Sequence, residues 1–350
     1  MTNIIYIFMG MNTWRVLLFP FALLYGGITT LRNVFFDGGL LPIHKIQTPS
    51  IGVGNLSVGG TGKSVVVDYL ISNFKNQFRI AVLSRGYGRV VKGVFVADEN
   101  STAASIGDEP YQFFSKHREI KVVVAEKRLL GLRKIEQAQP EVDLLILDDV
   151  MQHRFVQPTA LVLTTTYTEP YSSDFVLPMG NLRESRAGAQ RADVILVTKC
   201  PDDLTEQQMK DFREGLNVRP NQNVFFSKIN YATSIQNKGT QIKLNTLKTP
   251  FTLITGIADP APLEAYLRSL QLDFVHLSFP DHHRFTPSDI KQIKSTQNSG
   301  VILTTEKDFT RLYLLLQDEN LFYLPIEMGF FTPAREREFK DVLKKQLTLD

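Results

Sequence analysis

Residues 51–64 contain the pattern in this chain that most directly predicts chemistry. A short apolar run leads into a glycine-rich turn that closes on Gly62, Lys63 and Ser64, and the next residues are typical of a helix start. Strand, glycine turn and helix in this order form a phosphate-binding loop: backbone N–H groups and the lysine contact phosphate, and the serine hydroxyl contacts Mg²⁺. The predicted phosphate-binding residues are Ser57, Val58, Gly59, Gly60, Thr61, Gly62, Lys63 and Ser64.

The loop departs from the strict pattern at one position. Ser57 stands five residues before Gly62, where the pattern has a glycine. Gly59 and Gly60 supply the backbone freedom instead, because glycine adopts positive φ without steric cost. The alternative is a glycine turn that precedes Lys63 and Ser64 by coincidence.

A second signal, a pair of acidic residues, follows about 85 residues after the loop. Val142–Asp149 predicts a buried parallel strand that ends in Asp148 and Asp149. In phosphate-loop proteins such a strand end lies beside the loop, where a carboxylate holds Mg²⁺ directly or through water. A strand-end aspartate is often only a turn former, so the inference depends on the pairing with the loop.

Other polar clusters fall in predicted loops, and each has an ordinary alternative. Arginines in Ser84–Arg89 either clamp phosphate or are solvated. Asp108 is either a helix cap or a catalytic carboxylate. Gly180–Glu184, followed by Arg186 and Arg191, combines both charges. The adjacent histidines of Phe279–Thr286 either move a proton or lie in a surface loop capped by Asp281.

The elements that must position these residues alternate between β-rich and helical segments. Strands are predicted at Ser50–Leu56, Arg79–Ser84, Val94–Ala97, Lys121–Ala125, Leu144–Leu147, Ala160–Thr164 and Val194–Thr198. A second alternation predicts Phe251–Gly256, Phe274–Leu277, Val301–Thr305 and Leu321–Leu324. Apolar runs without alternation favour parallel strands covered on both faces.

The predicted fold is therefore α/β, with a phosphate-loop domain and a smaller α/β domain. The larger domain is a mainly parallel sheet with helices on both faces, of the P-loop NTPase type. We expect four parts: an apolar N-terminal region (1–37), the phosphate-loop domain (38–222), a polar β-hairpin linker (223–246) and the smaller domain (247–350). The linker hairpin is predicted from Asn223–Tyr231 and Gly239–Leu244.

Composition narrows the class of partner. The 350 residues are 43% hydrophobic and 21% charged, which is typical of a folded chain with proper cores. The net charge of +3 argues against nucleic acid as a partner. Cys200 is the only cysteine, so no internal disulfide is possible, and no Cys/His cluster has zinc spacing.

The N-terminal region is unusually apolar. Val16–Leu31 carries no charge, and aromatic residues surround it. A helix of this length spans roughly 24 Å, less than the ~30 Å hydrocarbon core of a membrane, and Pro20 and two glycines weaken a continuous span. We favour a helix lying in the membrane surface over a buried core helix or a true span. Residues before Trp14 are expected to be dispensable.

Taken together, the motifs resemble one family. Eight blocks occur in its order: Gly54–Ser64, Ser84–Gly88, Gly107–Pro110, Asp148–His153, Asn181–Glu184, Arg191–Asp193, Pro280–His283 and Thr305–Asp308. The chain resembles the tetraacyldisaccharide 4′-kinases, which are the lipid A 4′-kinases, from about residue 13 to past residue 310. Ser57 matches the Thr or Ser of that family, whereas Val150 and Met151 differ from its usual residues.

This resemblance implies an activity and a location. The family phosphorylates the 4′-hydroxyl of a tetraacylated glucosamine disaccharide 1-phosphate with Mg-ATP, in lipid A biosynthesis. The expected cofactor is Mg²⁺, the co-substrate is ATP, and the lipid disaccharide is the acceptor. The reaction takes place at the inner face of the cytoplasmic membrane, so we expect a peripheral membrane protein whose apolar helix brings the site to the lipid.

The resemblance also implies roles for single residues. Lys63 and Ser64 hold phosphate and Mg²⁺, with Asp148 and Glu184 as metal ligands. Asp108 becomes the base, oriented by His282 of the second domain. The residues expected to line the acceptor site are Asp149, Gln152, His153, Arg85, Tyr87 and Arg183, and Asp149 is also expected to be catalytic.

Two other classes share the phosphate loop. A metallochaperone or synthetase-type ATPase needs neither the apolar N-terminus nor the Pro280–His283 loop. A membrane-associated nucleotide switch lacks a base near the γ-phosphate.

Overall fold

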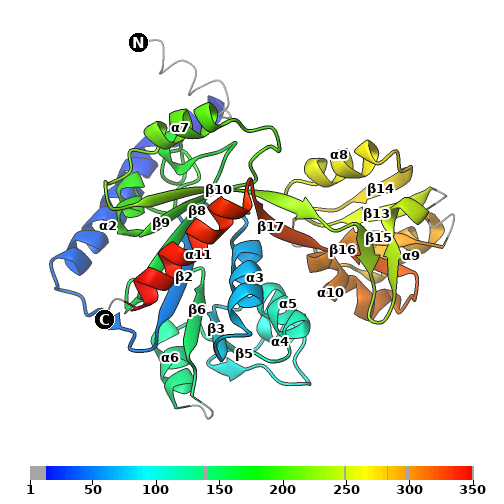
Figure 1. Cartoon of the computed structure of the whole chain (residues 1–350), viewed down its shortest axis with the longest axis horizontal. Coiled ribbons are helices and arrows are strands. Elements are labelled where there is room, and N and C mark those ends of the chain that lie inside the picture. The colour runs from blue at the N-terminus through cyan, green and yellow to red at the C-terminus, as the bar shows by residue number, and fades with distance from the viewer. Residues whose placement is uncertain (1–12, 138–140, 248–249, 282, 297–299, 349–350) are drawn as a thin grey trace.

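The computed structural model describes residues 13–137, 141–247, 250–281, 283–296 and 300–348. Two α/β domains lie side by side, with the larger on the left and the smaller on the right in Figure 1. The two β-strands that connect them, β10 (Asn223–Tyr231) and β17 (Ile326–Phe330), run antiparallel through the middle of the molecule.

The larger domain is built on a nine-stranded sheet with the order β17-β10-β9-β8-β2-β6-β3-β5-β4. Its other strands are β2 (Ser50–Asn55), β3 (Ile80–Ser84), β4 (Phe95–Val96), β5 (Lys121–Val124), β6 (Leu144–Asp148), β8 (Ala160–Thr166) and β9 (Val194–Thr198). All neighbours from β10 to β5 pair in parallel, and only the edge strands β17 and β4 are antiparallel. The predicted strands and the mainly parallel sheet are confirmed.

Helices cover both faces of this sheet, as predicted. One face packs against α3 (Lys63–Phe74), α5 (Asp108–Lys116) and α11 (Pro333–Thr348). The other packs against α6 (Arg128–Glu136) and α7 (Glu206–Gly215). Neighbouring residues of β6 alternate between the two cores: Ile146 joins the first and Leu147 the second. Burial on both faces explains why these strands are apolar throughout. The domain also contains α4 (Ala103–Ile106), the short pair β1 (His44–Lys45) and β7 (Val156–Gln157), and 3₁₀ turns at Tyr171–Ser173 and Arg186–Arg191.

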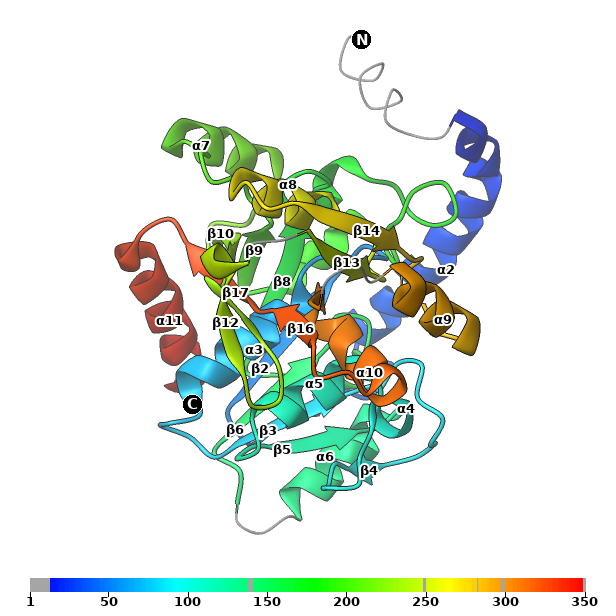
Figure 2. The same cartoon turned by 90° about the vertical axis from the view of Figure 1, so that its right-hand side faces the viewer.

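The smaller domain has a six-stranded sheet with the order β12-β11-β16-β15-β13-β14. The strands are β11 (Ser234–Gln236), β12 (Gln241–Lys243), β13 (Phe251–Thr255), β14 (Phe274–Ser278), β15 (Ile302–Thr305) and β16 (Leu321–Leu324). A 3₁₀ turn at Leu244–Thr246 follows β12. Helix α8 (Ala261–Ser269) packs on one face, and α9 (Pro287–Thr296) and α10 (Glu306–Leu316) on the other. Figure 2 shows α10 lying next to α5 of the larger domain.

The predicted linker and one domain boundary are wrong. Residues 223–246 are no separate hairpin, because β10 extends the main sheet and β11 and β12 belong to the second sheet. Residues 326–348 return to the larger domain, where Phe339 of α11 packs on Phe225 of β10 with ring centroids 5.3 Å apart. The predicted domain 247–350 therefore ends near residue 325. The local pattern of α11 does not show which of two cores it will cover.

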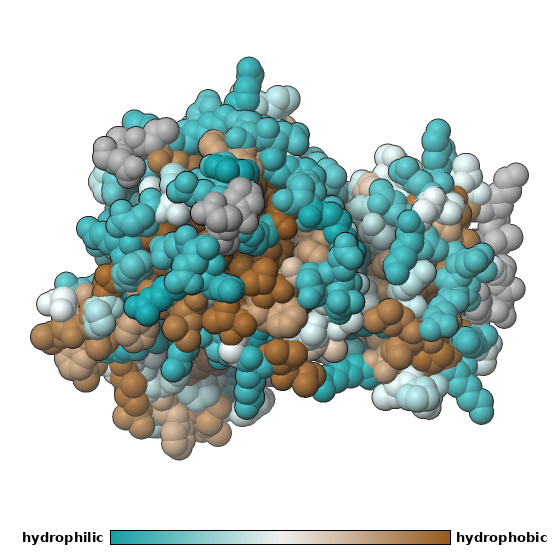
Figure 3. All heavy atoms as spheres, turned by 90° about the horizontal axis from the view of Figure 1, so that it is seen from below, coloured by the Kyte–Doolittle hydropathy of each residue, from teal (hydrophilic) through white to brown (hydrophobic). Residues whose placement is uncertain are grey.

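The N-terminal segment forms a 3₁₀ turn (Thr13–Leu18) and helix α2 (Phe19–Asp37), and Trp14–Asp37 is long and apolar enough to cross a membrane. Only 11% of its most apolar stretch is buried, so the alternative of a core helix is wrong. The large apolar residues exposed here are Trp14, Leu17, Phe19, Phe21, Leu23, Leu24, Ile28, Leu31, Val34 and Phe35. In Figure 3, apolar side chains gather at the lower left edge, the side where α2 lies in Figure 1.

Candidate active site

The phosphate loop connects the buried strand β2 to the start of α3. Gly59 has φ +103° and Gly62 has φ +79°, conformations that favour glycine and that turn the chain into the helix at Lys63. The loop is tied to its neighbours: the Thr61 and Thr164 hydroxyls lie 2.8 Å apart, and Val58 N–H donates to the Asn181 carbonyl at 2.7 Å. The predicted strand, turn and helix are therefore present and anchored to the next strand.

Lys63 lies among acceptors at the end of β2 and β6. Its Nζ donates to Asn55 Oδ1 at 3.1 Å and is 3.6 Å from Asp149 Oδ1. Asp149 has φ +49° and accepts two hydrogen bonds from Arg183, at 2.9 and 3.1 Å. Burial raises the pKa of Asp149, but Arg183 and Lys63 outweigh it and hold the pKa well below its usual value. Asp149 is therefore an ionised carboxylate shared by two cations.

Asp148 is the buried carboxylate beside the loop, as the sequence predicts, because β6 pairs with β2 so that Asp148 faces Val53. Its Oδ2 accepts from Ser84 Oγ at 2.8 Å, whereas its Oδ1 is buried without a hydrogen-bond partner among the described residues. Burial, together with the charges of Glu109 and Asp149, raises the pKa of Asp148 to about 7. An oxygen that is buried and unpaired next to a phosphate loop suits a cation.

Ser64 and Glu109 meet on the same side of the loop. Ser64 Oγ donates to Glu109 Oε1 at 2.8 Å, and the Glu109 charge acts on Asp148. The sequence prediction missed Glu109, although it lies in the Gly107–Pro110 block. Its signal was its position one residue after Asp108.

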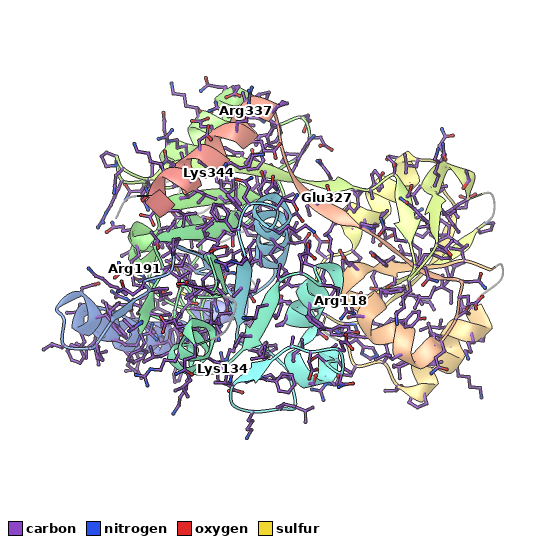
Figure 4. The ribbon with its side chains drawn as sticks, turned by 60° about the horizontal axis from the view of Figure 1, so that its bottom comes forward. Arg118, Lys134, Arg191, Glu327, Arg337 and Lys344 are labelled. Atoms are coloured by element: carbon purple, nitrogen blue, oxygen red, sulfur yellow. The ribbon has the colours of Figure 1, made fainter. Side chains whose placement is uncertain are left out.

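Glu184 does not fit the predicted role of a magnesium ligand. Its buried oxygens already accept four hydrogen bonds, from Asn33, Gln152 and twice from Arg191, at 2.7–3.0 Å. Burial raises the pKa of Glu184, but Arg191 and the other donors outweigh it and lower the pKa. The carboxylate joins helix α2 to the loop after β6 instead, and Figure 4 places Arg191 near α2.

Gln152 and His153 follow β6 and take different positions. Gln152 Nε2 donates inward, to the Asn55 carbonyl at 2.9 Å and to Glu184, so this amide serves the framework of the site. His153 is half-buried, and burial together with the charge of Arg128 lowers its pKa to about 4. A neutral imidazole can accept a hydrogen bond from a hydroxyl.

The loop after β3 carries Arg85 and Tyr87, which are both exposed. It packs backbone to backbone against the junction between α4 and α5, since a Cβ on Gly86 (φ +68°) would lie 2.6 Å from the Ile106 carbonyl oxygen at the end of α4. Gly107 (φ +97°) has the same constraint from the other side. This close packing keeps the Arg85 loop next to Asp108.

Asp108 is the first residue of α5, but Gly107 is the cap residue and no side chain caps this helix. The ordinary alternative of a helix cap is therefore wrong. Instead Arg311 of α10, in the smaller domain, donates to Asp108 Oδ1 from Nε at 3.0 Å and to Oδ2 from Nη2. His282 lies outside the described residues. His283 stacks on Phe279 and bonds Asp289 at 2.9 Å within its own domain.

Several residues of the site gave little or no signal in the sequence. Arg311 comes three residues after the Thr305–Asp308 block, and nothing in that spacing indicates a partner 203 residues away. Asn55, Asn33 and Arg128 were missed for the same reason. Their contacts depend on which strands and helices become neighbours.

Comparison with known proteins places the whole chain in one context. Residues 14–348 match the model of the tetraacyldisaccharide-1-P 4′-kinase family. The chain is 43% identical over 321 residues to a tetraacyldisaccharide 4′-kinase of Flavobacterium johnsoniae, covering 91% of this chain and 94% of the relative. The corresponding protein of Flavobacterium psychrophilum is 44% identical, covering 94% and 96%. The LpxK crystal structure from Aquifex aeolicus, a complex with ATP, is 29% identical, with a TM-score of 0.75 and coverage of 95% and 99%.

Proposed function

The chain belongs to the tetraacyldisaccharide-1-P 4′-kinase family, and we propose that it transfers the γ-phosphoryl group of ATP to the 4′-hydroxyl of a tetraacylated glucosamine disaccharide 1-phosphate. The observation that carries this proposal is the grouping of three features at the carboxyl ends of the central strands of the main sheet. This end of the sheet holds a phosphate loop, the buried Asp148, one of whose oxygens has no hydrogen-bond partner in the described part of the chain, and Asp108 at the start of a neighbouring helix.

The nucleotide occupies the loop. Backbone N–H groups at the start of α3 and the Lys63 ammonium bind the phosphates, where positive charge stabilises the transferring group. Lys63 contacts Asn55 and Asp149 at the mouth of the loop. Asp149, which Arg183 also holds, keeps the lysine at the end of β2 and so serves the reaction through Lys63.

Ser64, Asp148 and Glu109 fit Mg²⁺. Two carboxylates and a hydroxyl are the hard oxygen donors that this cation prefers, and Asp148 Oδ1 has no hydrogen-bond partner among the described residues. Asp148 and Ser64 retain the role that the sequence indicates, and Glu109 replaces Glu184. When bound, the cation neutralises charge on the β- and γ-phosphate oxygens.

Asp108 is the base. A carboxylate within hydrogen-bond reach of the 4′-hydroxyl takes its proton as the oxygen–phosphorus bond forms and ADP leaves. His282 of the smaller domain remains the proposed partner of Asp108. The acceptor lies between Arg85 and Tyr87 on one loop and His153 on another, where the neutral imidazole binds a sugar hydroxyl. Arg183 and Gln152 fix the loops around the acceptor through their bonds to Asp149 and Asn55.

Helix α2 places the site at the inner face of the cytoplasmic membrane, as a peripheral anchor. The contacts of the N-terminal segment with the larger domain begin at Arg15 of the preceding 3₁₀ turn, which donates to the Pro178 carbonyl at 3.0 Å. They continue along α2 with Tyr25, which donates to the Arg183 carbonyl at 2.8 Å, and end at Asp37 beside Arg154. A helix bonded to its domain along its length, with apolar side chains facing outward, suits a position in the membrane plane. Nucleic acid is not an expected partner.

Phosphoryl transfer to the lipid disaccharide tests this function. With labelled ATP and Mg²⁺, label should reach the disaccharide 1-phosphate, and omitting the acceptor should leave only slow hydrolysis. Acceptor-independent ATPase activity would favour a metallochaperone or synthetase-type protein. Hydrolysis that needs a protein partner would favour a nucleotide switch.

A double-mutant cycle tests the base and its partner. Asp108→Ala and His282→Ala should each lower kcat strongly and leave ATP binding intact, and the double variant should be little worse than the worse single one. Fully additive losses would assign the two residues separate roles.

A further inference from the structure

Residues 305–308 span the end of β15 and the first turn of α10, and their side chains contact one another and both domains. Thr305 Oγ1 and the Gly256 N–H both donate to Asp308 Oδ2 at 2.8 Å. Glu306 lies 3.8 Å from Lys116 of α5, and Lys307 lies 3.2 Å from Asp281. This segment stood out in the sequence, but the function proposed above does not use it. Its contacts place it at the junction between the two domains (Figure 2).

Arg311 lies one helical turn after this segment and crosses to the larger domain. Besides its two hydrogen bonds to Asp108, its Nη1 is 3.7 Å from Asp308 Oδ1 and 3.4 Å from the His283 carbonyl oxygen. Only 12% of the Arg311 side chain is exposed. The guanidinium therefore contacts Asp308 and the His283 carbonyl of its own domain while it binds Asp108 of the larger domain.

Asp308 is the support behind Arg311. It is fully buried, and its Oδ1 has no hydrogen-bond partner among the described residues, so the charge of Arg311 is what faces that oxygen. Thr305 and Gly256 fix the other oxygen. Buried carboxylates are costly unless paired, which indicates that Asp308 is present to hold the arginine.

A second charged pair joins the same two helices farther along. Lys116 bonds Asp68 at 2.7 Å and lies 3.8 Å from Glu306. The charge of Glu327, at the crossing of β17 between the domains (Figure 4), also acts on Lys116. The Lys116–Glu306 pair contacts both domains and is separate from the Asp108–Arg311 pair. Weakening it therefore tests the attachment of the two domains separately from the orientation of Asp108.

We propose that Arg311 is a positioning residue, through which the smaller domain fixes the orientation of the Asp108 carboxylate for proton transfer. Asp108 is the first residue of α5, and Arg311 binds both oxygens of its carboxylate. The planar guanidinium fixes the plane of this carboxylate, because two parallel N–H···O bonds set both position and orientation. Asp308 and Thr305 hold the guanidinium in place. The inference rests on the proposed role of Asp108 as base.

Steady-state kinetics of the full chain with Mg-ATP and the disaccharide 1-phosphate test this inference. Arg311→Ala should lower kcat about 10²-fold, as expected for a misplaced reacting group, while the KM for ATP stays near the wild-type value. Arg311→Lys should recover part of the loss because it keeps the charge but not the fork. Asp108→Ala combined with Arg311→Ala should be no slower than Asp108→Ala alone.

Glu306→Gln is the matched control. It weakens the Lys116–Glu306 pair and keeps the shape of the side chain. Because this pair does not orient Asp108, kcat should stay near the wild-type value. Thermal unfolding of each variant distinguishes lost positioning from lost fold. An unchanged kcat in Arg311→Ala, or an equal loss in Glu306→Gln, overturns the inference. Full activity of Asp108→Ala would instead overturn the base itself, and the two failures are thereby distinguishable.

Discussion

The proposed nucleotide side of the site consists of one loop and the ends of adjacent strands, whereas the proposed acceptor side is assembled from distant segments. Lys63, Ser64 and Asp148 come from β2, α3 and β6, which are neighbours in one sheet. The acceptor side needs helix α2, the loops after β3 and β6, and α10 of the other domain. Local pattern and strand register determine the first side, and tertiary contacts determine the second.

This difference has a physical consequence. Groups that parallel strand register places together stay together as long as the sheet is folded. Groups that long-range hydrogen bonds place together depend on each of those bonds. Substitutions should therefore act directly through chemistry on the nucleotide side, and through geometry or location on the acceptor side.

The largest expected effect is on the nucleotide side. Lys63→Ala removes the cation that stabilises charge on the transferring phosphoryl group, so kcat should fall by at least about 10²-fold. Arg183 still holds Asp149 in this variant, so the fold should persist. Lys75→Ala, at the other end of α3, is the matched control and should keep normal turnover. Near-normal activity of Lys63→Ala, measured with saturating lipid acceptor, would refute the nucleotide site.

The next effect is on the location of the acceptor side. Leu24→Glu with Ile28→Glu places two charges on the exposed apolar face of α2, where these side chains are 65% and 61% exposed. Binding to phospholipid vesicles should weaken roughly tenfold or more for each substitution, because the apolar burial in the membrane is lost.

Turnover of acceptor dispersed in detergent should stay near wild type in the same variant, since the inner face of α2 is untouched. Val275→Glu, on an exposed apolar residue of the smaller domain, serves as the control. Unchanged sedimentation with vesicles would argue against α2 as the membrane contact.

A smaller effect concerns the packing of the Arg85 loop on the junction between α4 and α5. Gly86→Ala combines an unfavourable φ with a Cβ 2.6 Å from a carbonyl oxygen, and it should destabilise the protein by about 2 kcal/mol and raise the KM for the acceptor. Gly88→Ala is the control: Gly88 has a similar φ of +75°, but an added Cβ would meet no atom within 4 Å. Its loss of stability therefore measures the cost of the backbone conformation alone. Equal losses of stability in urea unfolding would show that the close contact with the Ile106 carbonyl contributes nothing.

The smallest effect is a pH dependence from His153. Its pKa of about 4 lies below the usual 6.5, so between these values the unfolded chain binds a proton that the folded chain does not. The free energy of unfolding should therefore fall as pH drops through this window, by at most about 1.4 kcal/mol per pH unit. His153→Asn should flatten the profile, whereas His44→Asn, at an exposed histidine, should not. A profile that His153→Asn leaves unchanged would contradict the burial argument.

The sequence predicts most of the proposed nucleotide side and the parallel strands that surround it. Gly62, Lys63 and Asp148 can be inferred because glycine turns and apolar strands are local patterns whose neighbours follow from parallel register. The return of α11 to the larger domain has no such local signal, because an amphipathic helix fits any apolar surface. The contacts of Glu184 could not be predicted, because its hydrogen-bond donors Arg191 and Asn33 reach it from a 3₁₀ turn and from α2.

One pair of variants tests the division of labour between the two sides most directly. ATP binding by calorimetry and single-turnover phosphoryl transfer to the lipid disaccharide should be measured together for Lys63→Ala and Asp108→Ala. We expect Lys63→Ala to lose both ATP affinity and transfer. Asp108→Ala should bind ATP like wild type and lose transfer by about 10²-fold or more. Wild-type transfer by Asp108→Ala, or a loss of ATP binding equal to that of Lys63→Ala, would contradict the account.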